Sequence, residues 1–178
     1  RSAPEANEKL LGLGVNVYTS YIGWATVDTI KDEFRNIAAF YGSEKEAEEL
    51  IQYWNTKQKM LADMQSNIPG GKKKTVYYMN SKNPLQTHNK DVWAHQLITS
   101  AGGINVAADL VGNEVNIEQL LEWDPDVIFV NKDYSRPNIV EEIKGDPRFH
   151  NMKALKNNEL YVCPIGSTWW YIPSPEAP

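Results

Sequence analysis

The sequence predicts an α/β fold in which a parallel-sheet α/β lobe follows a long helical connector. Apolar residues recur at helical spacing over residues 27–64. Short apolar runs at 75–79, 127–130 and 159–163 are typical of buried strands in a parallel sheet. Helical patterns separate these runs, and the order β-α-β-α-β implies right-handed crossovers.

The N-terminal segment predicts a short helix over residues 6–11, ended by Gly12 and Gly14, and then a strand over 15–18. A single strand is not stable alone, and no parallel partner lies nearby in the sequence. We therefore expect 15–18 to be the last strand of another lobe.

The connector is predicted to contain two helices. Thr26 or Asp28 is the candidate N-cap of the first, and Gly42 ends it. Ser43 and Glu46 have the spacing of a capping box at the start of the second helix, which ends before Pro69. The apolar stripe of the pair is formed by Val27, Ile30, Phe34, Ile37 and Tyr41, then Ala47, Leu50, Ile51, Trp54, Leu61 and Met64.

The region after residue 74 predicts three strands separated by helices. The first helix has an apolar face of Val92, Trp93, Leu97, Ile98 and Ala101 and stops at Gly102-Gly103. Asn116, with Gln119 three residues on, is positioned to cap a second, short helix of Ile117, Leu120 and Leu121. Residues 139–143 are also predicted to be helical.

Composition excludes some classes of partner. The chain has 178 residues, with 18 Lys and Arg against 23 Asp and Glu and a net charge of -5. This balance argues against nucleic acid, which needs a basic patch, and Lys72-Lys73-Lys74 is interpreted as a solvated loop. The single cysteine, Cys163, excludes an internal disulfide and is predicted to be a small buried hydrophobe rather than a nucleophile.

Two segments carry a resemblance to a known family. Ala101-Gly102-Gly103-Ile104-Asn105-Val106-Ala107 precedes Glu118-Gln119-Leu120, and Asp124-Pro125-Asp126-Val127-Ile128 follows. In order and spacing this pattern resembles class III periplasmic binding proteins, which deliver iron chelates, haem or corrinoids to ABC importers. The resemblance covers almost the whole chain.

The resemblance implies a domain organisation. Residues 1–25 would be the tail of an N-terminal lobe, 26–70 the backbone helices between lobes, and 71–178 the C-terminal α/β lobe, truncated before its last helix. We expect a leader, and any lipid anchor, to lie outside this chain. The full-length protein is expected to be a monomer, and the exposed face between lobes favours a non-native dimer of this chain.

The same resemblance implies a function. We expect an extracytoplasmic substrate-binding protein, not an enzyme, that delivers a ferric siderophore to an ABC importer permease. Glu118 matches the family's docking carboxylate. From the residues alone, Glu118 is better explained as a surface acid that complements the helix dipole.

Candidate ligand-binding residues follow from the position of the loops. In open α/β sheets, ligands bind outside the carboxyl ends of the strands, which selects the loops at 80–89, 131–136 and 164–171. Trp169, Trp170 and Tyr171 could grip a large flat ligand, or pack at the sheet edge and beneath a further helix. His88 could contact a chelate or ligate haem iron, or be a solvated loop residue. Lys132, Asp133, Tyr134 and Arg136 could bind the anionic groups of a chelate, or form an ordinary polar loop.

The sequence is also compatible with functions other than ferric siderophore delivery. A corrinoid or haem binder of the same family is one, with His88 or a tyrosine as the axial ligand of haem. A metal-ion binding protein or an α/β hydrolase is another, although His88, His95 and His150 lack metal-site spacing and no nucleophile motif is present. We predict no catalytic residues, no protein-bound metal and no resident cofactor.

Overall fold

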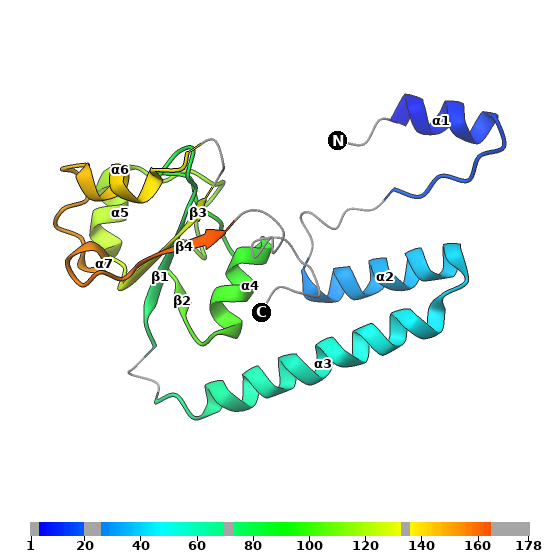
Figure 1. The fold of residues 1–178 in the computed structure, drawn as a ribbon, viewed down its shortest axis with the longest axis horizontal. Coiled ribbons are helices and arrows are strands. Elements are labelled where there is room, and N and C mark those ends of the chain that lie inside the picture. Colours follow the sequence, from blue (N-terminus) through cyan, green and yellow to red (C-terminus); the bar gives the residue numbers. More distant parts are fainter. Residues whose placement is uncertain (1–3, 20–25, 70–72, 133–135, 165–178) are drawn as a thin grey trace.

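The computed structural model describes residues 4–19, 26–69, 73–132 and 136–164. Figure 1 shows a hairpin of two long helices, α2 and α3, beside a unit built around a sheet. Helix α1 (Pro4–Gly12) and the segment after it run along α2. None of the helices in these ranges is long and apolar enough to cross a membrane.

Residues 15–18 do not form the predicted strand. They are coil, and Tyr18 donates a hydrogen bond from its hydroxyl to Glu33 of α2 at 2.7 Å. A strand is defined by hydrogen bonds to a neighbouring strand, and the described part of the chain supplies none here. The prediction of a strand at 15–18 is therefore wrong for this chain.

Helix α2 (Val27–Tyr41) begins and ends as the sequence predicts. Thr26 is the N-cap, with its side-chain oxygen accepting from Thr29 N at 3.3 Å, so Asp28 is not the cap. Gly42 ends the helix in the left-handed conformation, with φ 68°.

Helix α3 (Glu44–Ser66) starts without the predicted capping box. Ser43 makes no side-chain capping hydrogen bond, and its N–H, which Glu46 would bind in a capping box, is donated to the Ala38 carbonyl at 2.9 Å. This bond belongs to the turn that closes α2, and it sets the backbone of Ser43 at φ −124° and ψ 36° rather than in the extended conformation of a typical N-cap.

The α2–α3 hairpin packs against α4 (Trp93–Ser100) through three buried side chains, Ile30, Trp54 and Trp93. The rings of Trp54 and Trp93 are stacked, with centroids 6.5 Å apart. The predicted stripe does not stay buried to its end, since Tyr41 is 76% and Met64 60% exposed.

The sheet is parallel, with strand order β2-β1-β3-β4. Strands β1 (Thr75–Met79), β3 (Val127–Lys132) and β4 (Leu160–Pro164) match the predicted runs. Strand β2 (Ile104–Asn105) was not predicted, since two residues carry no periodicity. The predicted fold class, a parallel α/β lobe after a helical connector, is confirmed.

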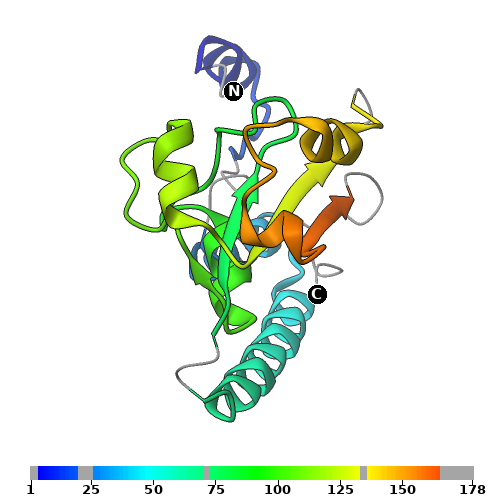
Figure 2. The same cartoon turned by 90° about the vertical axis from the view of Figure 1, so that its left-hand side faces the viewer.

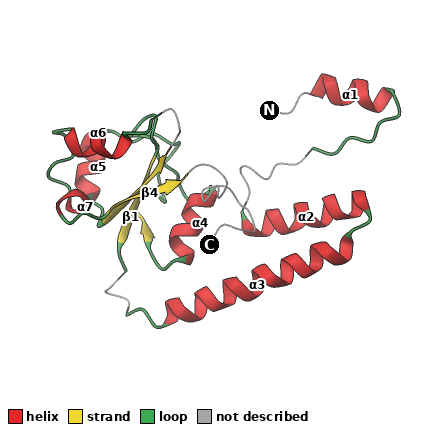
Figure 3. Ribbon diagram, viewed as in Figure 1, coloured by secondary structure: helices red, strands yellow, loops and turns green. Residues whose placement is uncertain are grey.

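Helices cover both faces of the sheet. Figures 1 and 3 show α5 (Ile117–Trp123), α6 (Ile139–Gly145) and α7 (Lys153–Lys156) on one side and α4 on the other. Figure 2 shows α3 extending beyond the sheet. The first face is the main core, and it includes Tyr77, Met79, Ile128, Val130, Leu120, Ile139, Ile143 and Phe149. The second face packs Val76, Tyr78 and Val127 against Ala94 and Ile98 of α4.

Local signals explain two of the turns around the sheet. Asn116 caps α5 as predicted, accepting from Gln119 N at 2.7 Å. Gly102 follows α4 with φ 84°, as predicted for a glycine stop. The four-residue helix α7 was not predicted.

Candidate ligand-binding edge of the sheet

The parallel strands bring their carboxyl ends to one edge. Lys132 is paired with Pro164, and Met79 with Val130. The carboxyl ends of β1, β3 and β4 therefore lie at one edge, which is where open α/β sheets bind ligands.

His88 lies at this edge, half-buried in the loop after β1. Its ring centroid is 5.0 Å from that of Tyr78, with the planes inclined at 60°. Burial lowers the pKa of His88 below its ordinary value, because the imidazolium would lose hydration. His88 is therefore neutral at pH 7 and can accept a hydrogen bond or ligate a metal.

Asn105, the last residue of the short strand β2, joins three segments beside β1, level with Val76. Its side chain is 4% exposed. Its amide nitrogen donates to the His88 carbonyl at 2.9 Å and lies 3.3 Å from Nδ1 of His95. Its oxygen accepts from Ala107 N at 3.1 Å. The loop after β1, the start of α4 and the turn after β2 thus share one buried amide.

The other end of the loop after β1 is held by β3. The buried residue Ser81 donates its backbone N–H to Oδ1 of Asn131 at 2.6 Å. The Tyr77 hydroxyl donates to the Pro84 carbonyl at 3.0 Å. The loop that carries His88 is therefore fixed to the sheet at both ends and in its middle.

Arg136, after β3, forms an ion pair and a hydrogen bond with Glu142 of α6. No hydrogen bond or ion pair joins Arg136 to His88 in the described ranges. Asp133, Tyr134, Trp169, Trp170 and Tyr171 lie outside the described residues, as does the side chain of Lys132, so their roles stay predictions.

Cys163 is partly exposed, whereas the sequence predicted a small buried hydrophobe. It is half-buried and lines a pocket of about 190 Å³ with Tyr78, Leu97 and Phe129. Burial raises the pKa of its thiol to about 11, so the thiol stays protonated at neutral pH. That Cys163 is not a nucleophile stays a prediction.

Glu118 lies in the first turn of α5 and is exposed. Among the described side chains it has no ion-pair partner, whereas its neighbour Glu122 accepts from Gln119 at 3.2 Å. An exposed, unpaired carboxylate is compatible both with docking and with a dipole-complementing surface residue.

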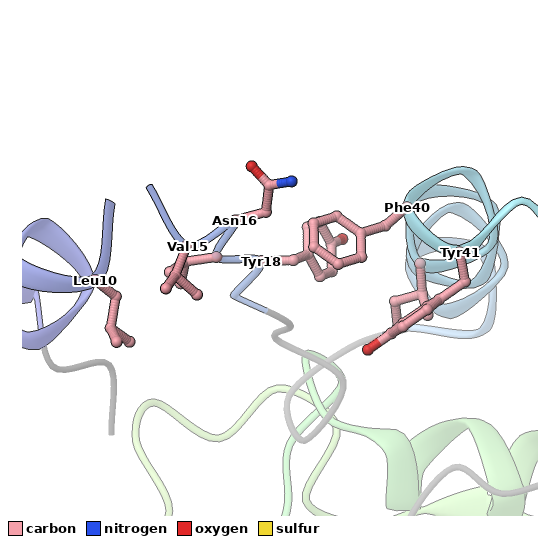
Figure 4. Close-up of a pocket in the computed structure, with 8 residues that line it drawn as sticks. Leu10, Val15, Asn16, Tyr18, Phe40 and Tyr41 are labelled. Carbon is pink, nitrogen blue, oxygen red and sulfur yellow. The ribbon is translucent and has the colours of Figure 1, made fainter. Parts of the chain in front are cut away.

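A second, open hollow lies between the N-terminal segment and α2. It has a volume of about 410 Å³ and is lined largely by apolar side chains, among them Leu10, Val15, Tyr18, Phe40 and Tyr41 (Figure 4). Leu13, nearby in the chain, is 79% exposed. This end of the molecule therefore presents apolar surface to solvent.

The described residues contain no group of three or more His, Cys, Asp or Glu side chains that could hold a metal ion. The imidazoles of His88 and His95 and the guanidinium of Arg136 are instead suited to the oxygen atoms of a larger ligand or, for His88, to one open position of a chelated metal.

Sequence reasoning missed Asn105, Ser81 and Asn131 as organisers of this edge. Asn105 could have been found, because it is a polar residue in the segment that carried the family resemblance and it follows a glycine pair at a strand. Ser81 and Asn131 carry no comparable signal, since their contact joins residues 50 positions apart.

Residues 2–165 match the family described as periplasmic binding protein. The chain belongs to this family, and the predicted resemblance to class III binding proteins of ABC importers is confirmed.

Named relatives share this family. The molybdate-binding protein MolA of Haemophilus influenzae is 30% identical over 84% of this chain and 42% of its own length. The Fe(3+)-citrate-binding protein YfmC of Bacillus subtilis is 27% identical over 77% and 43%, and the vitamin B12-binding protein of Salmonella typhi is 30% identical over 94% and 58%. The chain spans about half the length of the curated relatives it matches.

A solved periplasmic solute binding protein from Veillonella parvula has the same fold, with TM-score 0.75 and 29% identity over 97% of this chain and 53% of its own. Molybdate-bound MolA gives TM-score 0.73 and 25% identity over 97% and 58%. These relatives are named as binding proteins for small ligands, not as enzymes.

Proposed function

We propose that this chain is the connector and C-terminal lobe of an extracytoplasmic substrate-binding protein that delivers a ferric chelate to an ABC importer. The observation that carries the proposal is the loop after β1, which contains His88 and is held in place by the side chains of Asn105 and Asn131. This loop belongs to a lobe of the periplasmic-binding-protein family. The relative that binds ferric citrate supports the choice of ligand class.

The proposed ligand contacts combine described and undescribed residues. His88 offers a neutral imidazole, and Arg136 offers a guanidinium for the anionic groups of the chelate. Asp133, Tyr134, Trp169, Trp170 and Tyr171 belong to the same proposal through their positions after β3 and β4. Aromatic rings at this edge would add contact area and stacking to the polar contacts.

The proposal also assigns roles to the connecting helices, to Glu118 and to a second lobe of the full-length protein. The apolar hollow along α2 would pack against an N-terminal lobe, of which residues 1–25 would be the tail, and α2 and α3 would join the two lobes. Glu118 would dock on a basic group of the permease. The protein would act outside the cytoplasm, as periplasmic binding proteins do.

Titration of the two-lobed protein, followed by intrinsic tryptophan fluorescence, tests the ligand. Ferric citrate and a ferric hydroxamate should quench the fluorescence in a saturable way and be recovered unchanged. Gallium citrate, which has similar charge and shape, should compete with ferric citrate. Flat responses to both iron chelates would contradict the ferric-chelate proposal.

A corrinoid ligand is the second candidate, favoured by the vitamin B12-binding relatives at up to 30% identity. Cyanocobalamin should then bind in the same titration while the iron chelates do not. Haem is distinguished by a Soret band that appears with hemin and is lost in His88→Ala.

A further inference from the structure

Helix α4 lies between the sheet and the α2–α3 hairpin and contacts both (Figure 1). Ala94 and Ile98 of α4 pack on the sheet, whereas Trp93 and Leu97 pack against the hairpin. The two contacts therefore use adjacent faces of the same two helical turns. While α4 stays on the sheet, the hairpin can move relative to the sheet only by separating from α4.

The start of α2 is joined to α4 by Gln96. The Val27 N–H, the first of α2, donates to Oε1 of Gln96 at 2.9 Å. The first N–H groups of a helix have no partner within the helix, so the Gln96 side chain supplies one from α4. A backbone N–H can only donate, so the Gln96 side chain must accept here.

The end of α3 is joined to the end of α4 by Gln65. Its side-chain nitrogen donates to the Thr99 carbonyl at 2.8 Å and also to the Ser100 carbonyl. Both carbonyls belong to the last turn of α4, where carbonyl groups lack partners within the helix. A carbonyl can only accept, so the Gln65 side chain must donate here.

A buried apolar contact joins the same helices. Ile30, Trp54 and Trp93 are all buried, and the two tryptophan rings are stacked. The hairpin thus meets α4 at three separate points, which run from Trp93 in its first turn through Gln96 to the carbonyls of its last turn. A rotation of the hairpin about one of these points would break the contacts at the other two.

We propose that Gln65 and Gln96 are positioning residues that hold the α2–α3 hairpin on α4, so that the hairpin and the sheet form one rigid body. When the two-lobed protein closes on its ligand, the hairpin then moves together with the sheet. The rigid-body step depends only on the contacts of α4, whereas the lobe-closure step rests on the function proposed above.

Native-state hydrogen exchange of the two-lobed protein tests the rigid body without ligand. In a single body, the amides of α3 beside Trp54 and those of α4 beside Ile98 should open with the same free energy and the same dependence on urea. A smaller opening free energy and a weaker urea dependence for α3 would show that the hairpin separates alone. That result would overturn the proposal even if no variant folds.

Substitutions to alanine and glutamate test the donor and acceptor roles separately. Gln65→Ala and Gln96→Ala should each raise the exchange rates of the α3 amides about three- to tenfold, the effect of one lost hydrogen bond. Gln96→Glu keeps an acceptor for Val27 and should exchange as wild type. Gln65→Glu sets a carboxylate against two carbonyl oxygens, so its exchange should be at least as fast as that of Gln65→Ala.

Gln58→Ala is the matched control, because Gln58 accepts from Lys31 within the hairpin at 2.8 Å. It should leave the exchange of α4 unchanged. Wild-type exchange in Gln65→Glu would contradict the role of Gln65. Exchange in Gln96→Glu as fast as in Gln96→Ala would contradict the role of Gln96.

Spin labels on α3 and α7 test the lobe-closure step. Lys45→Cys and Lys156→Cys, at exposed positions, are labelled in a Cys163→Ala background of the two-lobed protein. Electron–electron double resonance is recorded with and without gallium citrate or cyanocobalamin. One distance population that does not change on binding is expected, because both labels lie on one rigid body. A shift of that population on binding would overturn the lobe-closure step.

Failure of the proposed function gives a different result. If neither probe binds, the ferric-chelate and corrinoid proposals are contradicted for these probes. The ligand-free protein still decides the rigid body, since one distance population supports it and two populations overturn it.

Discussion

Thr75 and Asp126 close the amino-terminal edge of the sheet with reciprocal hydrogen bonds. Asp126 accepts from both the N–H and the hydroxyl of Thr75 at 2.9 Å, and the Thr75 hydroxyl accepts from Asp126 N at 2.9 Å. The pair joins the first residue of β1 to the residue before β3. It lies at the edge opposite to the candidate site, so its role is in stability.

Asp126 is expected to make the fold acid-sensitive. The Thr75 N–H lowers the pKa of Asp126 below its ordinary 3.8, so the ionised form stabilises the fold above pH 3.8, and this contribution is lost as the pH falls through the folded-state value. Asp126→Asn should cost about 1 kcal/mol at neutral pH and flatten the fall in unfolding free energy below pH ~4. Urea denaturation across pH checks this, with exposed Asp91→Asn as the control. An unchanged acid profile would contradict the assignment.

His88 should produce a second, separate pH dependence. Its pKa is lowered by burial, so the unfolded chain takes up the proton first as the pH falls below 6.5. Stability is full above pH 6.5 and declines toward the folded-state pKa. His88→Gln, which stays neutral, should remove this decline when unfolding free energies are compared at about pH 8 and about pH 5. The same decline in His88→Gln would show that another group causes it.

The joint between the helical hairpin and α4 should depend on Trp54. This side chain is 8% exposed and stacks on Trp93. Trp54→Ala should cost about 3–5 kcal/mol, since it leaves a cavity among buried apolar side chains. Met60→Ala, on the same helix but 47% exposed, should change stability by less than ~0.5 kcal/mol. Equal effects in chemical denaturation would contradict this packing.

Gly102 is required by its backbone and its surroundings. It has φ +84°, and a Cβ there would lie 2.8 Å from Cδ1 of Ile68. Gly102→Ala should destabilise the chain by about 1–2 kcal/mol. Gly145→Ala is the control, because nothing lies within 4 Å of its added Cβ, and it should be neutral or slightly stabilising. Thermal denaturation of both variants measures the difference.

The elements that sequence could predict are those with a repeating pattern. Strands β1 and β3 are continuous apolar runs, and α2 combines an apolar stripe with Thr26 and Gly42 as its ends. Strand β2 and helix α7 are too short to show a period. The predicted capping box is absent at Ser43, where the local turn that ends α2 directs the Ser43 N–H to the Ala38 carbonyl, so that this N–H is not available to Glu46.

The sequence was sufficient to predict which loops form the candidate site, but not the side-chain contacts within it. The rule for carboxyl ends located the loop of His88, but the buried amide of Asn105 and the bond between Ser81 and Asn131 arise only when the strands pair. Arg136 has an acidic partner on the following helix, Glu142, six residues along the chain. Side-chain partners of this kind depend on the path of the backbone, which residue spacing alone does not determine.

Glu118 provides a test of the permease partner that is independent of the ligand. It is exposed and unpaired among the described side chains, so Glu118→Ala should leave the melting temperature and ligand affinity unchanged. If it docks on a basic group, ATP hydrolysis by the importer in vesicles should need about 3–10-fold more Glu118→Ala protein for half-maximal stimulation, and Glu118→Lys should be weaker still. Glu141→Ala, an exposed acid in the first turn of α6, is the matched control. Stimulation by Glu118→Lys at the wild-type concentration would leave Glu118 as a surface acid that complements the dipole of α5.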